Sequence, residues 1–208
     1  MPFLITLKLA ALTTLIVFVL SIPLAYLIVF KKWKGKAIVE SILMMPIILP
    51  PTVLGFYFLI IFSKNSTIGK FLNDTFNLEL AFTFQGILFG SVIFCLPFML
   101  TPIIAGFRNI PKNIVESTIM LKKKGLNVLK NVFIPYAKRS ILAGILLTVA
   151  HTIGEFGVVL MIGGKMEGTR VASVAIFDEM NRGNYDAAHA YALTLFGGDD
   201  LSGVGGGL

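Results

Sequence analysis

Two ionisable side chains, His151 and Glu155, stand out in a segment that is otherwise apolar. A spacing of four residues places both on the same face of a helix. A charge at the centre of a membrane costs about 3 kcal/mol, while the dozen Leu, Ile, Val and Phe residues between positions 141 and 162 return roughly 4 to 7 kcal/mol. The segment therefore still inserts into a membrane, and Glu155 is expected to avoid lipid.

Acid–base chemistry within a membrane would need ionisable residues that converge at one depth. Asp178 is the next candidate after His151 and Glu155, but it falls outside the apolar segments. Two histidines, one cysteine and no Gly-rich phosphate loop leave no constellation for nucleotide hydrolysis and no Cys-based metal site. An intramembrane enzyme is thus a remote alternative, and we expect no catalytic residues, metal or cofactor.

The composition indicates an all-α integral membrane protein. Of the 208 residues, 56% are hydrophobic and only 14% are charged, and the mean hydropathy is +0.85, which is too apolar for a soluble domain of this size. The net charge of +7 could suggest nucleic acid, but the basic residues fall in short loops between apolar runs. Membrane topology explains them better, so no nucleic-acid partner is expected.

Four apolar segments are long enough to cross a bilayer, which takes about 20 residues. They cover residues 9–30, 38–62, 80–107 and 141–162. An incomplete fifth span begins at 187–196, and the Gly-rich tail 197–208 is expected to reflect a truncation, a frameshift or appended expression sequence. Consecutive prolines remove helical hydrogen bonds, so Pro50, Pro51 and Thr52 are expected to face the interior of the bundle.

Charge asymmetry predicts the orientation. The loops around 31–37 and 108–139 hold twelve Lys and Arg residues, against five in the other two loops. Since basic loops stay inside, the N-terminus is predicted outside. Within the loop 108–139, Pro111 can start a helix, Gly125 can break it and Pro135 can open a second helix. The sequence predicts a helical hairpin on the inner membrane surface.

This loop resembles the Glu-Ala-Ala loop of binding-protein-dependent ABC importer permeases, which inserts into a groove on an ATPase subunit. The resemblance rests on Glu116-Ser117-Thr118 and on the closing Val132-Phe133-Ile134-Pro135. Ser117 and Thr118 replace the two Ala, and Lys122 stands where the family has Gly, so that Gly125 would supply the turn instead. The alternative is a solvated basic loop without a docking role.

Three further strings resemble the molybdate-type permeases of this family. They are Met45 to Tyr57 with its Leu-Pro-Pro centre and Gly55, then Gly154-Glu155-Phe156-Gly157, and finally Glu167-Gly168-Thr169-Arg170 with its first two residues exchanged. The matches run in order from Leu9 to about Leu195. Sulfate and thiosulfate permeases share much of this scaffold and remain an alternative.

The resemblance implies the polytopic helical bundle of a type I importer permease in a bacterial inner membrane. It also implies a homodimer, separate ABC ATPase subunits and an external oxyanion-binding protein as partners. The proposed translocation path or gate takes in these residues: Pro50, Pro51, Thr52, Gly55, His151, Gly154, Glu155, Phe156 and Gly157.

Two interpretations of Glu155 remain open. Either its helix face lines the path or the dimer interface, with Gly154 and Gly157 where helices approach closely, or Glu155 is a buried residue that serves packing alone. A carboxylate repels an oxyanion, which argues against direct substrate binding by Glu155 unless it is neutral or paired. A passive channel is a further alternative, but it gives the structured inner hairpin no evident use.

Overall fold

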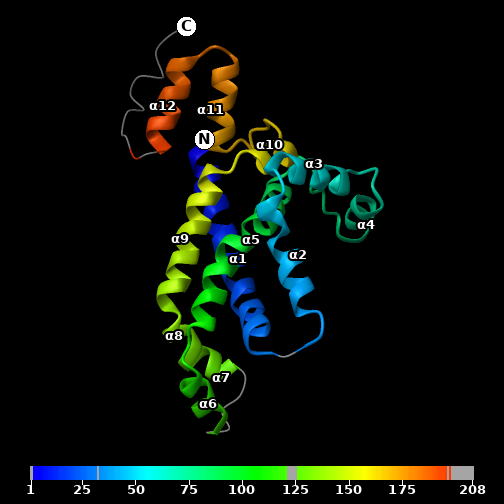
Figure 1. Ribbon diagram of the computed structural model, residues 1–208. Helices are drawn as coiled ribbons and strands as arrows, with labels where there is room; N and C mark the ends of the chain where they lie inside the picture. Colours follow the sequence, from blue (N-terminus) through cyan, green and yellow to red (C-terminus); the bar gives the residue numbers. More distant parts are fainter. Residues whose placement is uncertain (1, 32, 121–125, 196, 198–208) are drawn as a thin grey trace.

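Three long helices form the body of the molecule. The computed structural model describes residues 2–31, 33–120, 126–195 and 197, and this part of the chain contains helices and no strands. Helices α1 (Pro2–Phe30), α5 (Phe84–Arg108) and α9 (Lys138–Gly154) pack lengthwise against one another (Figure 1). Their shared core includes Val17, Ile103 and Ile141, all buried. The predicted all-α bundle is confirmed.

The segment predicted as the second span is divided into two helices. Helix α2 (Lys36–Ile48) ends at Leu49, whose backbone is extended because a following proline disfavours the helical region. Helix α3 (Pro51–Phe62) then starts with Pro51 in its first turn and turns away from α2 by 109°. The chain therefore makes a corner where a kinked span was expected.

The corner changes the surroundings of the prolines. Pro50, Pro51 and Thr52 are all exposed, so the expectation that they face the interior of the bundle is wrong. The physical reason is that the two prolines end one helix and begin another instead of bending a continuous one.

The segment predicted as the fourth span is also interrupted. Helix α9 ends at Gly154, Glu155 has an extended backbone (φ −67°, ψ 127°), and a short helix α10 (Gly157–Gly163) follows. Glu155 therefore lies just beyond the helix that carries His151. The prediction that both residues share a face of one continuous helix does not hold.

The basic loop folds into short helices at one end of the bundle. Helix α6 (Lys112–Met120) follows Pro111, as predicted. The second arm begins earlier than Pro135, with α7 (Leu126–Val128), the π-helical turn η1 (Leu129–Phe133) and α8 (Ile134–Tyr136). Figure 1 shows the loop between α1 and α2 at the same end as α6, so both predicted inner loops lie together.

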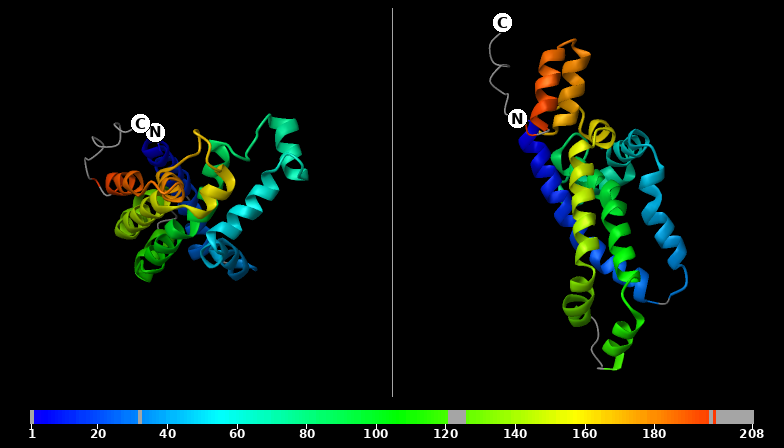
Figure 2. Two further views of the ribbon diagram at one scale, coloured as in Figure 1. Left: turned by 90° about the horizontal axis from the view of Figure 1, so that it is seen from above. Right: turned by 60° about the vertical axis from the view of Figure 1, so that its left-hand side comes forward.

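The opposite end carries helices where the sequence predicted loops. Helix α4 (Thr67–Phe76) lies in the connection between α3 and α5, and α11 (Ala172–Asn181) lies between α10 and α12 (Tyr185–Leu195). Helices α11 and α12 form a hairpin beside the N-terminus (Figure 2). Most of the tail predicted at 197–208 lies outside the described residues.

Among the described residues, two helices are long and apolar enough to cross a membrane alone, α1 and α5. The number rises to four if each of two bent pairs is one span, namely α2 with α3, and the segment Leu129–Tyr136 with α9.

Candidate functional site

The two broken helices meet at a glycine contact. A Cβ atom added to Gly157 at the start of α10 would lie 2.8 Å from Pro51 Cβ and 3.0 Å from Thr52 N at the start of α3. A Cβ atom on Gly55 would lie 2.8 Å from Met161 Cβ and 2.9 Å from Val158 Cα. Only residues without a side chain allow α3 and α10 to approach this closely. The structure thus brings the Pro-Pro and Gly-Glu-Phe-Gly strings together.

Glu155 holds the break between α9 and α10. Its side chain is only 3% exposed, and its Oε1 accepts a hydrogen bond of 2.8 Å from the Val158 backbone N–H. The carboxylate therefore satisfies a free N–H at the start of α10, where the helix dipole favours negative charge. The Glu155 carbonyl oxygen accepts a second bond of 2.6 Å from Ser173 Oγ in α11. Both ends of the residue are engaged by the protein itself.

His151 lies one turn before the break and packs on aromatic rings. Its imidazole stacks on Phe98 of α5 with 3.9 Å between ring centroids. Its Nε2 is 3.9 Å from Glu155 Oε2, too far for a hydrogen bond, and it has no hydrogen-bond partner among the described residues. His151 is a partly buried aromatic contact with one free polar atom close to the carboxylate.

The remaining members of the predicted path differ in their surroundings. Gly154 has open space where a Cβ atom would stand. Phe156 packs on Phe177 of α11 with 4.8 Å between ring centroids. Sequence reasoning missed Ser173 and Phe177, because nothing in the sequence indicated that α11 returns to the break.

The basic loop 108–139 presents the motif residues on α6 and at the end of its second arm. Glu116 is exposed, as is Pro135, and Ile134 is partly buried. The hydroxyls of Ser117 and Thr118 each donate a 2.7 Å bond to a backbone carbonyl one turn earlier, so both fit a helix where the family has Ala. Lys122 and Gly125 lie outside the described residues, and the predicted turn at Gly125 stays a prediction.

Comparison with known proteins decides the family. Residues 17–197 match the model of the binding-protein-dependent transport system inner membrane component. The chain belongs to this family. The permease is therefore one component of a transport system that also contains a binding protein and a separate ATPase subunit, and the permease itself is not an enzyme.

Curated relatives agree with the family model. The permease is 36% identical to the molybdenum transport system permease protein ModB of Azotobacter vinelandii over 92% of this chain and 86% of that protein. It is 32% identical to the putative molybdenum transport system permease protein YvgM of Bacillus subtilis over 77% of this chain and 71% of that protein. The sulfate transport system permease protein CysW of Synechococcus elongatus is 27% identical over 90% and 68%.

An ion pair links the start of the basic loop of the permease to α2. Arg108, the last residue of α5, donates from Nη2 to Glu40 Oε1 at 2.8 Å. The two residues are 68 positions apart, and Glu40 is the single carboxylate within an apolar stretch. Sequence reasoning treated that stretch as a span and missed the pair. The contact places the start of the hairpin in direct connection with the broken helix pair α2 and α3.

The hairpin is also anchored by aromatic packing. Phe133 of η1 is buried and stacks on Phe30 at the end of α1, with 4.2 Å between ring centroids. Phe30 in turn contacts Phe107 at the end of α5, at 5.9 Å. A displacement of the second arm would therefore disturb the packing at the ends of α1 and α5.

A buried carboxylate organises the opposite end. Asp178 of α11 pairs with Lys165 at 2.6 Å, with Arg170 at 3.0 Å and with Arg182 at 3.1 Å. The hydrogen bond from Lys165, together with the charges of all three cations, holds the pKa of Asp178 below its usual value although burial opposes this. Asp178 thus belongs to a structural network of ion pairs outside the long helices. It does not join His151 and Glu155 in one site.

Proposed function

We propose that this permease forms the membrane path for molybdate or tungstate, supplied by an external binding protein and driven by a separate ATPase. The observation that carries the proposal is the close contact of α3 and α10 at Gly55 and Gly157, which joins the two strings that resemble molybdate-type permeases. The names of the relatives that are 36% and 32% identical support the substrate.

The path is proposed to lie between two copies of the chain. Pro50, Pro51 and Thr52 are exposed on one subunit, as are Phe56 and Tyr57 further along α3. Since freed backbone groups at membrane depth must face protein or a water-lined cavity, this corner needs a second subunit or the path beside it. A homodimer with the α3 corners facing each other satisfies that requirement.

Glu155 is proposed to position α10 and not to contact substrate. Its carboxyl group is buried and accepts the hydrogen bond from the Val158 N–H, so it is not presented to an oxyanion. The His151 side chain is 33% exposed against 3% for Glu155, so its ring is the better placed of the two to meet the path, while its Nε2 is itself buried.

Coupling is proposed to run from the inner hairpin to the α3 corner. The ATPase would engage α6 through the exposed face that carries Glu116, and motion of the hairpin would pass through Arg108 and Glu40 to α2. Helix α2 has one buried residue, Pro46, and packs on α5, so the proposed motion turns α2 about the corner at Pro50 and changes its contacts with α5, while α3 keeps its close contact with α10. Such a hinge would open the path alternately to each side.

The N-terminus is proposed to lie outside and the hairpin inside, which follows from the basic residues around α6 and between α1 and α2. The described helices supply four crossings only if the bent pairs span the membrane, and this is part of the proposal.

A sulfate permease is the second candidate, favoured by the similarity to the sulfate permease of Synechococcus elongatus. The test is co-purification with the ATPase, followed by ATP hydrolysis in proteoliposomes with binding protein that is empty, loaded with molybdate or loaded with sulfate. Selective stimulation by the molybdate-loaded protein supports the proposal. Stimulation by sulfate alone would replace the substrate, and hydrolysis that ignores the binding protein would refute the importer.

A further inference from the structure

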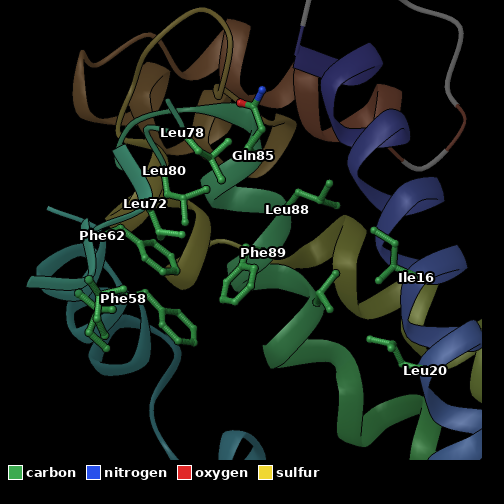
Figure 3. A pocket seen from close by; sticks show the side chains of 13 residues that line it. Ile16, Leu20, Phe58, Phe62, Leu72, Leu78, Leu80, Gln85, Leu88 and Phe89 are labelled. Atoms are coloured by element: carbon green, nitrogen blue, oxygen red, sulfur yellow. The ribbon is translucent and has the colours of Figure 1, made fainter. Parts of the chain in front are cut away.

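A large apolar cavity opens on the side of the bundle. It has a volume of about 760 Å³ and lies among α1, α3, α4 and α5 (Figure 3). That volume falls within the roughly 300–1,000 Å³ of ligand pockets. Its walls are formed by Ile, Leu, Phe and Val side chains, and Gln85 is the only lining residue with a polar side chain. Nothing in the transport proposal uses this cavity.

The polar groups near the cavity gather at one end. Figure 3 shows the Gln85 amide pointing away from the apolar side chains that fill the view. The neighbouring Phe84 carries the Lys8 ammonium over its ring, 4.7 Å from the centroid. Lys8 is exposed and has no carboxylate partner within the described part of the chain. It precedes the lining residue Ile16 by eight positions, or about 12 Å along α1.

Helix α4 marks the depth of this end. Its apolar residues Ile68, Phe71, Leu72 and Phe76 recur at helical spacing, and Ile68 and Leu72 line the cavity. Phe71 and Phe76 are exposed, at 60% and 65%. An amphipathic helix with exposed aromatic side chains is typical of the interface between headgroups and acyl chains. The cavity therefore runs from the interface into the hydrocarbon.

We propose that this cavity holds an acyl chain of an anionic phospholipid, whose phosphate group lies between the Lys8 ammonium and the Gln85 amide. A cation and an amide donor at one end of an apolar cavity complement an anionic amphiphile. The medium outside the opening is the membrane in which this family works. In the proposed orientation the lipid belongs to the outer leaflet.

The headgroup is tested by native mass spectrometry of the purified, delipidated permease titrated with phosphatidylglycerol or phosphatidylcholine of identical acyl chains. Phosphatidylglycerol should bind about fivefold more tightly, the ratio for about 1 kcal/mol per basic residue at an anionic surface. Lys8→Gln should remove that preference, while Lys70→Gln, a matched change at an exposed lysine of α4 outside the cavity lining, should keep it. Equal binding of both lipids to the wild type would overturn the proposal.

The acyl-chain site is tested by filling the cavity. Val92→Phe should lower bound phosphatidylglycerol at least fivefold, and Leu146→Phe, at an exposed position of α9 away from the cavity, should not. Unchanged binding in Val92→Phe would overturn the site. A loss of dimer with lipid binding retained would assign the cavity to a second copy instead. Lys8→Gln alters an exposed side chain and keeps the test decisive if Val92→Phe does not fold.

Discussion

The close contact between α3 and α10 predicts that alanine has opposite effects at the two glycines of one short motif, Gly154 and Gly157. In Gly157→Ala the new methyl group would stand 2.8 Å from Pro51 Cβ, 3.0 Å from Thr52 N and 3.2 Å from the Pro51 carbonyl carbon. Two of these atoms are backbone and the third belongs to a proline ring, so none can swing aside. Overpacking of this kind costs about 1–3 kcal/mol. Gly154→Ala, three residues earlier, meets no atom within 4 Å and should be neutral or slightly stabilising.

The assay is thermal unfolding of the detergent-purified permease, followed by size-exclusion chromatography of the soluble fraction. Gly157→Ala should lower the melting temperature by several degrees, at about 2–4 °C per kcal/mol for a chain of this length, while Gly154→Ala should not lower it. Transport by Gly157→Ala should fall as well, because α3 and α10 are forced apart. Equal melting temperatures for the two variants would refute the close contact and the clamp built on it.

Further predictions follow from the carboxylates. Glu155→Ala should lower the stability of the permease by about 0.5–2 kcal/mol, because the hydrogen bond from the Val158 N–H is lost. Glu155→Gln keeps an acceptor for that bond and should transport near the wild-type rate. An inactive Glu155→Gln variant would mean that the charge of Glu155 matters for transport. Glu116→Lys should insert normally but lose coupling to the ATPase, and wild-type transport in that variant would remove the docking role. The hydrogen bond from Lys165 lowers the pKa of Asp178 in the folded state. The ionised Asp178 therefore stabilises the fold fully above the unfolded pKa of about 3.9, and this stabilisation is lost as the pH falls through the lower folded pKa. The melting temperature should thus fall more steeply below about pH 4 in the wild type than in Asp178→Asn, and parallel curves would contradict this.

The sequence predicted the helical class, the family and the helix that follows Pro111, because these depend on composition and on local strings. It did not locate the two breaks, because Pro50-Pro51 was expected only to kink a continuous span and residues 141–162 were expected to form one continuous helix. It did not predict that the breaks lie against each other, because the contact depends on a 109° turn that no local pattern encodes.

Long-range polar contacts were beyond sequence reasoning for a related reason. Arg108 had a sufficient local explanation as a basic loop residue, and Glu40 fell unremarked within the run 38–62 that was predicted as a span. Their pairing depends on how α2 lies along α5. Ser173 likewise carries no signal until α11 folds back on the Glu155 carbonyl.

The most direct test of the transport proposal is molybdate accumulation in proteoliposomes that contain the permease and its ATPase. ATP is enclosed, molybdate-loaded binding protein is added outside, and molybdenum is measured by elemental mass spectrometry. We predict accumulation that requires both hydrolysable ATP and binding protein and that fails in Glu116→Lys. Entry at the same rate with a non-hydrolysable analogue would indicate a passive channel and contradict the account.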